Sequence, residues 1–439
     1  MAILNISDTA FDGNLKTYYQ KVREDVFPVI TPLFAQFQKF KSGGPRNMRW
    51  GGKGAVFDVV VADPTGWHWS DTGRLPESQF RDEVQGSVGV KRMYIRQQFD
   101  KLAVTGTGNK QAAYVTLAQK IDEEVRAKFK LGVQEALHGD GRGIKATVTN
   151  VVSATVIDVA NPYGLTGGGQ GALWLQKGAY VDVLDSTGAT SRGKKVISTI
   201  ALQTAPDTYR VTLASANSAM STGDILVSAS SADNSFNASI NGLINLTNRA
   251  NGFASLHGIS NATWARWDAT RMTAGTDTPR AEQLLESDLV ELMMRVAARS
   301  GKNAMQDPSE FVFVTTPGLK KSFIESVQGQ RQLTLAQTSK TLNGGYAATA
   351  SCNEVPILDD PYCPVGTVYL LHLPSLGWVD AQDFGQVEYE GASAWRWVAD
   401  RDAYETSSSI FFNTATTFRG AHGSIIGYTD AFRYSPVAA

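Results

Sequence analysis

The stretch that decides the fold is residues 110–141, KQAAYVTLAQKIDEEVRAKFKLGVQEALHGDG. Apolar side chains recur along it every three or four residues and form one stripe: Tyr114, Leu117, Ile121, Val125 and Phe129. This spacing predicts an amphipathic helix over residues 110–137, about 40 Å long at roughly 1.5 Å per residue. The glycines that follow are a stop signal. We expect this helix to be the backbone of the fold, with the stripe as its core face.

A long hairpin is predicted upstream of the helix. Residues 55–61, AVFDVVV, have the composition of a strand, and residues 87–96, SVGVKRMYIR, predict the return strand. The polar residues 63–80 lie between them as a broad tip. A two-stranded hairpin cannot form a hydrophobic core by itself, so we expect this hairpin to pack against another surface. The first 49 residues contain a short helical pattern broken by prolines and predict an arm.

The hairpin carries candidate contact residues of two kinds. The first are on the polar tip: Trp67, Trp69 and Arg74. Large aromatic residues on a projecting loop commonly anchor an interface, and the alternative is that the tip packs on itself. The second are the basic residues that follow on the return strand: Lys91, Arg92 and Arg96. These are interpreted as contacts to an acidic neighbouring subunit, contacts to nucleic acid, or a solvated strand face.

The composition changes downstream of the helix. Residues 143–235 are rich in Gly, Ser, Thr and Val, with short evenly spaced β-runs, and they predict a small inserted barrel or sandwich. A mixed α/β region follows. Thr278-Pro279 is predicted to open a helix that stops at Gly301, and a strand at residues 310–314 leads into a second helix ending near Gly329. The remainder predicts strands.

Composition narrows the classes of function. Charged residues are 19% of the 439-residue chain, against roughly 25% in an average globular protein. A low fraction of charged residues is typical of a chain whose surface is covered by other copies of itself, because charges are depleted at the cores of interfaces. The alternative is a large monomer whose surface is solvated through Ser and Thr. The net charge of −1 argues against a globally basic nucleic-acid binder. No signal peptide or membrane span is recognised, so we expect cytosolic synthesis, with Cys352 and Cys363 as buried thiols.

No motif for catalysis or for a cofactor stands out. The 5 histidines are scattered and none has metal-ligand spacing. The glycines at residues 106–108 lack the Gly-Lys-Ser/Thr ending of a phosphate loop. Asp359 with Asp360, and Glu388 with Glu390, are the best carboxylate pairs, and Glu388 and Glu390 leave a carbohydrate-active enzyme as a distant alternative. We expect a protein without enzymatic activity, cofactor or metal.

The order of these elements resembles that of tailed-bacteriophage major capsid proteins with the Hong Kong ninety-seven fold, over nearly the whole chain. Residues 138–143, HGDGRG, and 240–243, INGL, look like the family's junctions after the long helix and after an insertion. The resemblance implies an α+β fold with six parts: an N-terminal arm (1–49), an extended-loop hairpin (50–101), the spine helix of a peripheral domain (102–142), an inserted all-β domain (143–235), an axial domain (236–390) and C-terminal return strands (391–439).

The resemblance also implies a function. Such proteins self-assemble into hexamers and pentamers of an icosahedral shell that encloses double-stranded DNA, after assembly in the host cytoplasm. Expected partners are the chain itself, scaffolding, portal and decoration proteins, and DNA through non-specific proximity, with no membrane. The tip has no lysine, so a covalent cross-link is not expected there, although Lys53 and Lys91 flank it. An encapsulin-like compartment shell is the nearer alternative.

Overall fold

The computed structural model has a mixed helix and sheet fold that divides into two compact units. It describes residues 33–40, 49–50, 54–62, 67–75, 77, 80–100, 110–163, 172–202, 208–230, 232–249, 252–328, 350–386, 395–398 and 402–430. The first unit, here the helix unit, comprises residues 1–31, 90–134 and 380–412. The second, here the sheet unit, comprises residues 32–89, 135–379 and 413–439.

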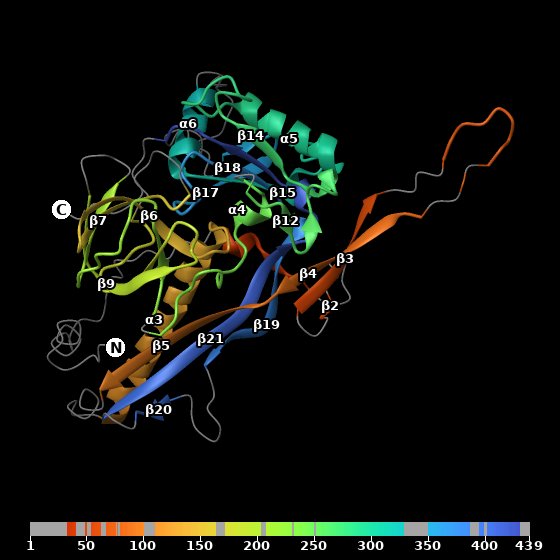
Figure 1. Cartoon of the computed structure of the whole chain (residues 1–439). Helices are drawn as coiled ribbons and strands as arrows, with labels where there is room; N and C mark the ends of the chain where they lie inside the picture. The colour runs from red at the N-terminus through yellow and green to blue at the C-terminus, as the bar shows by residue number, and fades with distance from the viewer. Residues whose placement is uncertain are drawn as a thin grey trace, which may run out of the picture. The chain divides into compact units, whose positions relative to one another are not determined.

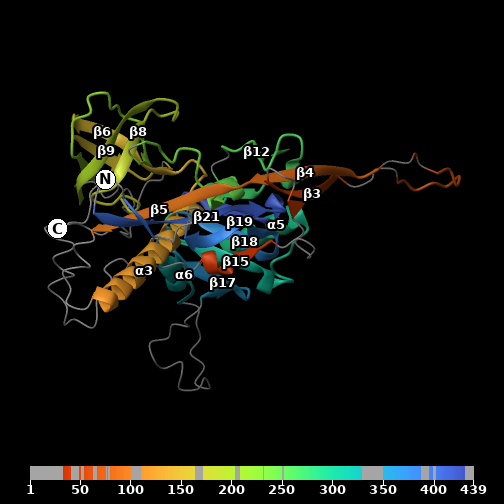
Figure 2. The ribbon, with the colours of Figure 1, turned by 90° about the horizontal axis from the view of Figure 1, so that it is seen from below.

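The helix unit combines one long helix with long strands. Its elements are α3 (Lys110–Leu137), β5 (Lys91–Asp100), β19 (Leu376–Gln386), β20 (Trp395–Trp397) and β21 (Ala403–Thr416), of which α3, β19 and β21 continue into the sheet unit. β5 runs antiparallel to β21, and β20 also pairs with β21. Figure 2 shows α3 along one face of these strands. Phe129 of α3 meets Phe384 of β19 edge-on, with ring centroids 4.8 Å apart.

A six-stranded mixed sheet lies at the centre of the sheet unit. Its strands, in spatial order, are β14 (Thr270–Thr273), β22 (Gly423–Ile426), β18 (Val368–His372), β15 (Phe311–Thr315), β17 (Val355–Asp359) and β16 (Ser351–Cys352). Every residue of β15 and β18 is buried, as in strands covered on both faces. Two helices, α5 (Glu286–Ser300) and α6 (Pro317–Gln328), pack against this sheet (Figure 1). Each fully buried Leu of α5 contributes roughly 1.5–3 kcal/mol.

A closed barrel follows α3 in the chain. Its strands are β6 (Ile144–Ser153), β7 (Val156–Ala160), β8 (Tyr180–Leu184), β9 (Ser191–Leu202), β10 (Tyr209–Leu213) and β11 (Ile225–Ser228), closed in the order β10-β7-β6-β11-β8-β9. Closure leaves no free sheet edge, and small apolar side chains with Tyr209 fill the interior. The chain enters and leaves the barrel at neighbouring points, because the Asn237 amide donates to the Arg142 carbonyl at 3.0 Å.

The hairpin belongs to a separate three-stranded sheet. It consists of β2 (Arg49–Trp50), β3 (Gly54–Ala62) and β4 (Asp82–Gly89). Near it, β1 (Gln38–Lys39) runs parallel to the start of β19. The remaining short elements are η1 (Phe34–Gln36), α4 (Leu243–Leu246), β12 (Ser255–Leu256), β13 (Ile259–Ser260), η2 (Ala265–Trp267), η3 (Pro308–Glu310), η4 (Leu373–Ser375) and η5 (Arg419–Ala421).

Several sequence predictions are confirmed and several need correction. The long helix has the predicted bounds, and both cysteines are buried thiols that form no disulfide. The predicted return strand is two strands, because β4 pairs with β3 whereas β5 pairs with β21, and Val90 belongs to neither. The strands of the barrel fall within residues 143–235, while the proposed domain boundaries stay predictions.

The start of α5 was also predicted wrongly. Thr278 forms a turn instead of opening the helix, since its hydroxyl accepts from the Gly275 amide and donates to the Arg280 carbonyl. The helix begins at Glu286, where the Asp288 carboxylate accepts the Leu285 amide at 3.2 Å. Its end is as predicted, because Gly301 adopts the left-handed conformation, φ 72°, that terminates helices.

Candidate functional site

The base of the β3–β4 hairpin is anchored in a small apolar core. Ala55, Phe57 and Val88 are buried there in a cluster that also contains Trp267. Gly86 lies against the ring of Phe57, where a Cβ would come within 2.6 Å of it, so a larger residue would displace the ring. Burial then declines along β3, and no residue after Phe57 in that strand is buried. The core therefore holds the hairpin only at its base.

The tip of the hairpin has the opposite character. Its large apolar side chains are exposed: Trp67 (73%), Trp69 (94%), Leu75 (88%) and Phe80 (93%). This exposure rules out the alternative that the two tryptophans are buried by packing of the tip on itself. Apolar side chains gathered on a projecting loop are characteristic of a surface that another chain covers.

A local turn orders the tip. The Ser70 hydroxyl accepts the Arg74 amide at 3.0 Å, and Gly73 supplies the positive φ of 69° that the turn requires. Asp71 sits in this turn, two residues after Trp69. Among the described residues the carboxylate of Asp71 and the guanidinium of Arg74 have no partner, and both are exposed. The tip thus presents indole rings beside charges that have no partner in the described part of the chain.

The basic residues of the second predicted set lie in the helix unit, not with the tip. Arg96 of β5 donates to the Glu405 carboxylate of β21 through its Nε at 2.8 Å, and Gln98 also donates to that carboxylate. Glu405 is buried, so Arg96 compensates a charge within its own chain. Arg92 lies 5.4 Å from the ring centroid of Phe411 and is exposed. Lys91 begins the same strand.

The predicted core stripe of the long helix is only partly visible. Val125 and Phe129 are buried. The side chains of Tyr114, Leu117 and Ile121 lie outside the described residues, although their backbone is helical. Arg126, beside the stripe, lies 4.9 Å from the ring centroid of Phe384.

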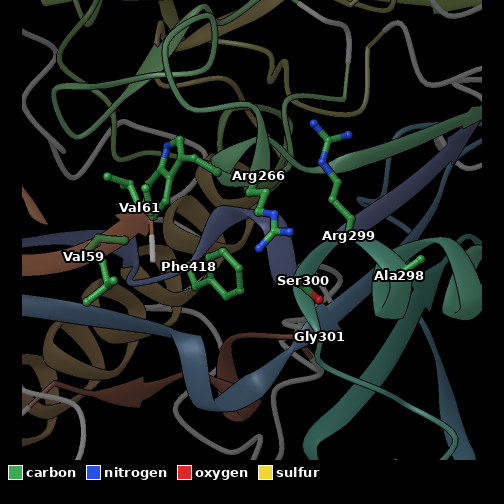
Figure 3. A pocket seen from close by; sticks show the side chains of 11 residues that line it. Val59, Val61, Arg266, Ala298, Arg299, Ser300, Gly301 and Phe418 are labelled. Carbon is green, nitrogen blue, oxygen red and sulfur yellow. The ribbon is translucent and has the colours of Figure 1, made fainter. Parts of the chain in front are cut away.

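A pocket of about 360 Å³ opens beside the base of the hairpin, within the sheet unit. Figure 3 shows Val59 and Val61 of β3 on one side of it, and Arg266 and Arg299 with the end of α5 on the other. The ring of Phe418 lies between them. Arg299 donates to the Ala265 carbonyl at 2.6 Å. The lining is therefore apolar on the hairpin side and cationic on the helix side.

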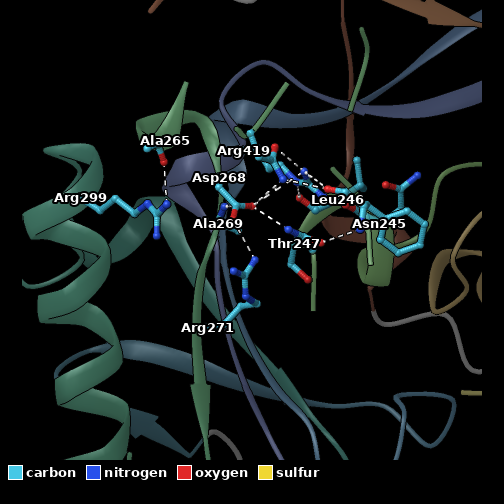
Figure 4. Close-up of polar contacts among 12 residues, drawn as sticks. Asn245, Leu246, Thr247, Ala265, Asp268, Ala269, Arg271, Arg299 and Arg419 are labelled. Carbon is cyan, nitrogen blue, oxygen red and sulfur yellow. Dashed lines mark hydrogen bonds and ion pairs between the residues drawn. The ribbon is translucent and has the colours of Figure 1, made fainter. Parts of the chain in front are cut away.

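Arg419 is a fully buried cation that the sequence did not reveal. Its guanidinium donates to the backbone carbonyls of Asn245, Leu246 and Phe253, at 2.6 to 3.3 Å, and Figure 4 shows it reaching the α4 turn. Asp268 lies 3.9 Å away. Burial lowers the pKa of Arg419 to about 10, so the group stays charged at neutral pH. Arg419 is the donor to the Leu246 carbonyl at the end of α4, and it adds to the Asn248 amide and the Asn261 side chain as a donor to the Asn245 and Phe253 carbonyls.

Two histidines near Arg419 are held neutral. Burial lowers the pKa of His257 to about 3, with a further contribution from Arg419. Burial, with His372 and Arg419, does the same for His422. One nitrogen of each ring accepts a backbone hydrogen bond: the Thr416 amide donates to Nε2 of His257, and the His372 amide donates to Nδ1 of His422. Charging either ring would break bonds in a dry site.

Three residues have the hydrogen-bond spacing of a catalytic triad, but their serine is buried and none of them lines the pocket beside the hairpin base. The Ser375 hydroxyl lies 3.0 Å from Nδ1 of His372, whose Nε2 lies 3.1 Å from Glu310. Ser375 is buried, its hydroxyl also donates to the His372 carbonyl, and none of the three residues lines the pocket described above. This arrangement is a hydrogen-bond network within the fold. Within the described residues no group of three or more potential ligands is placed to hold a metal ion.

No helix in the described ranges is long and apolar enough to cross a membrane. No family model matches the sequence. No curated protein matches it either.

Solved structures define the class of fold: it is the fold of tailed-phage capsid proteins, the Hong Kong ninety-seven fold. The cyanophage A-1(L) capsid asymmetric unit matches with a TM-score of 0.57 and 12% identity, over 93% of this chain and 96% of that chain. The capsid of a native GTA particle matches at 0.45 and 9% identity, over 93% of each chain. The holo-SrpI encapsulin complex from Synechococcus elongatus PCC 7942 matches at 0.38 and 9% identity, over 88% of this chain and 85% of that chain.

Proposed function

We propose that this chain is a major capsid protein that self-assembles into hexamers and pentamers of an icosahedral shell around the double-stranded DNA genome of a tailed phage. The observation that carries the proposal is the hairpin, whose base has a core and whose tip exposes two tryptophans to solvent. Its fold, which is similar to that of the cyanophage capsid chain, supports the same function.

The proposed action is assembly, and it involves no chemical reaction. The first partner is a second copy of the chain, and scaffolding, portal and decoration proteins are further partners. The packaged DNA is near the shell without sequence-specific contacts, which agrees with the net charge of −1. The place of the mature protein is the virion capsid, after assembly in the host cytoplasm. Lys91 and Arg92 remain proposed contacts between subunits.

The physical basis of assembly is the apolar area of the tip. Fully burying an aromatic side chain contributes roughly 1.5–3 kcal/mol, and much of that is spent on ordering the partners. One such contact is therefore weak. A shell closes because the same contact recurs on every copy, so a small loss per contact becomes a large loss over the whole particle.

Expression of the chain, alone and with its scaffolding protein if one exists, tests the proposal by light scattering and negative-stain electron microscopy. We expect rings or closed shells. The double variant Trp67→Ser/Trp69→Ser should remain monomeric yet folded. Tyr180→Ser removes an exposed aromatic residue from the barrel and is the matched control. A wild-type chain that stays monomeric under all these conditions would refute the proposal.

The content of the particles separates the phage shell from a compartment shell. Packaged DNA in particles from the native source supports the capsid, whereas a single co-purifying protein cargo would indicate an encapsulin-like shell. The carboxylates of the distant enzyme alternative, Glu388 and Glu390, lie outside the described residues.

A further inference from the structure

The side chains that line the pocket beside β3 include several hydrogen-bond donors and no carboxylate. Arg266 is exposed, and its guanidinium has no partner among the described residues. Arg299 uses one N–H for the Ala265 carbonyl and has others free to donate. Trp267 lines the same pocket, is 2% exposed, and its indole N–H has no acceptor within the described part of the chain. No acidic side chain contributes to the lining.

The other wall of the pocket is apolar. It is formed by residues 59–62 of β3 and by Phe418, and Val60 in this wall is 49% exposed. A simple anion would leave this wall in contact with water, and a cation would face two guanidinium groups. The pocket therefore fits a ligand that joins a carboxylate to an aromatic or aliphatic group. Its volume of about 360 Å³ is near the lower end for ligand sites, which suits one or two side chains.

The hairpin tip has this combination of groups. Trp69 is 94% exposed, and Asp71 follows it in a turn fixed by Ser70 and Gly73. The Asp71 carboxylate has no partner among the described residues. The tip does not occupy the pocket of its own chain, because its side chains are exposed. A knob and a complementary pocket at different places on one chain make a head-to-tail contact, which closes into rings when copies are related by rotation.

We propose that this pocket receives the hairpin tip of a second copy, with Asp71 paired to Arg266 and Arg299 and with Trp69 against the β3 wall and Phe418. This inference rests on the proposed function, and it identifies the surface of the neighbouring subunit that the hairpin tip contacts. Charge-assisted pairs between a carboxylate and a guanidinium are the stronger class of hydrogen bond, and complementary charge also fixes the register of an interface.

A charge exchange tests the pairing. Asp71→Arg alone and Arg266→Glu alone should each lower the assembled fraction by about tenfold or more, as expected when a paired interface charge is reversed. A mixture of the two variants should again form six-membered rings, in which the variants alternate, because each tip then finds an opposite charge in the pocket of the other variant. Arg280→Glu reverses an exposed arginine of the same unit outside the pocket and should assemble normally.

A peptide of residues 66–76 provides a second measurement. Labelled with a fluorophore, it should bind the Asp71→Arg subunit, whose pocket is intact, and bind the Arg266→Glu subunit at least about tenfold more weakly. Wild-type assembly together with normal assembly of both single variants would overturn the pairing and leave the capsid function standing. Failure of the mixture to assemble, with no peptide binding, would also overturn it. A wild-type chain that never assembles would instead refute the proposed function.

Discussion

The hairpin tip and the surroundings of Arg419 lie in the same unit, but they differ in which side chains they bury. The tip exposes large apolar side chains, whereas the surroundings of Arg419 bury a charged one. At the tip, Trp69 is almost fully exposed and Asp71 has no partner among the described residues. Around Arg419, a charged group is fully buried and donates to backbone carbonyls and to the Asn261 side chain. Large apolar groups in water and a cation in the core are both costly when left alone.

This difference separates two kinds of stability. The Arg419 site finds its partners within the chain, so its residues should determine whether the subunit folds. The tip lacks such partners, so its residues should determine whether subunits associate. Variants of the two regions are therefore expected to have separable effects, and each prediction below measures one side of that separation. The Trp67→Ser/Trp69→Ser background keeps the subunit unassembled, so that unfolding is measured on one species.

The largest effect is expected for Arg419→Met. The variant removes the guanidinium that donates to the Asn245, Leu246 and Phe253 carbonyls and leaves Asp268 with one cation fewer, so unfolding in urea should show a loss of about 3–5 kcal/mol. Arg295→Met is the control, because Arg295 is exposed and pairs with Glu291 and Asp277 at the surface. Such surface pairs contribute about 0–1 kcal/mol. Equal losses in the two variants would contradict the role given to Arg419.

The next effect is a dependence of stability on pH. The unfolded chain binds a proton at His257 and His422 near pH 6.5, whereas in the folded chain their pKa values are about 3. Because the unfolded state holds more protons in this window, the free energy of unfolding rises with pH between the two values. At pH 5 each histidine should lower the free energy of unfolding by about 2 kcal/mol, relative to a pH at which both states are neutral.

His422→Gln tests this dependence. Its urea unfolding between pH 5 and 6.5 should have a slope lower by about 1 kcal/mol per pH unit than that of the parent. The variant is expected to be less stable at pH 7, since it alters a buried network, so the slope is the diagnostic quantity. An unchanged slope would mean that His422 is not held neutral in the fold. His68→Gln, which makes the same substitution at the exposed tip, is the matched control.

The smallest effect on folding is expected at the tip. In the monomeric state Trp69→Ser should change the free energy of unfolding by no more than about 0.5 kcal/mol, as for other surface substitutions. The same substitution should strongly reduce assembly. A large loss of subunit stability would show that the tip contributes to the core of its own chain, and the two regions would then differ less than the structure indicates.

The long helix and the exposed tip could be predicted because their signals are local. Periodicity defines α3, glycines end it at Leu137, and polar neighbours mark Trp67 and Trp69 as surface residues. The end of α5 was likewise visible at Gly301. These features depend on residues within one or two turns of the chain.

The rest depends on contacts between distant parts of the chain. Arg419 sits in a glycine-rich stretch that predicts only a turn, and its acceptors are mainly backbone carbonyls, which any residue supplies. The division between β4 and β5 follows from partners far apart in sequence, β3 and β21. The pocket combines residues from four segments of the chain. A local sequence pattern does not indicate which distant segments come into contact.

The joint at the base of the barrel has a further consequence. The Arg142 carbonyl accepts a hydrogen bond from the Asn237 amide, so the inserted barrel begins and ends at neighbouring points of the chain. A polypeptide whose own ends meet could replace residues 144–235 without stretching either side. In a shell built from many copies, each subunit would then carry one copy of the inserted polypeptide, and these copies would repeat at the spacing of the subunits.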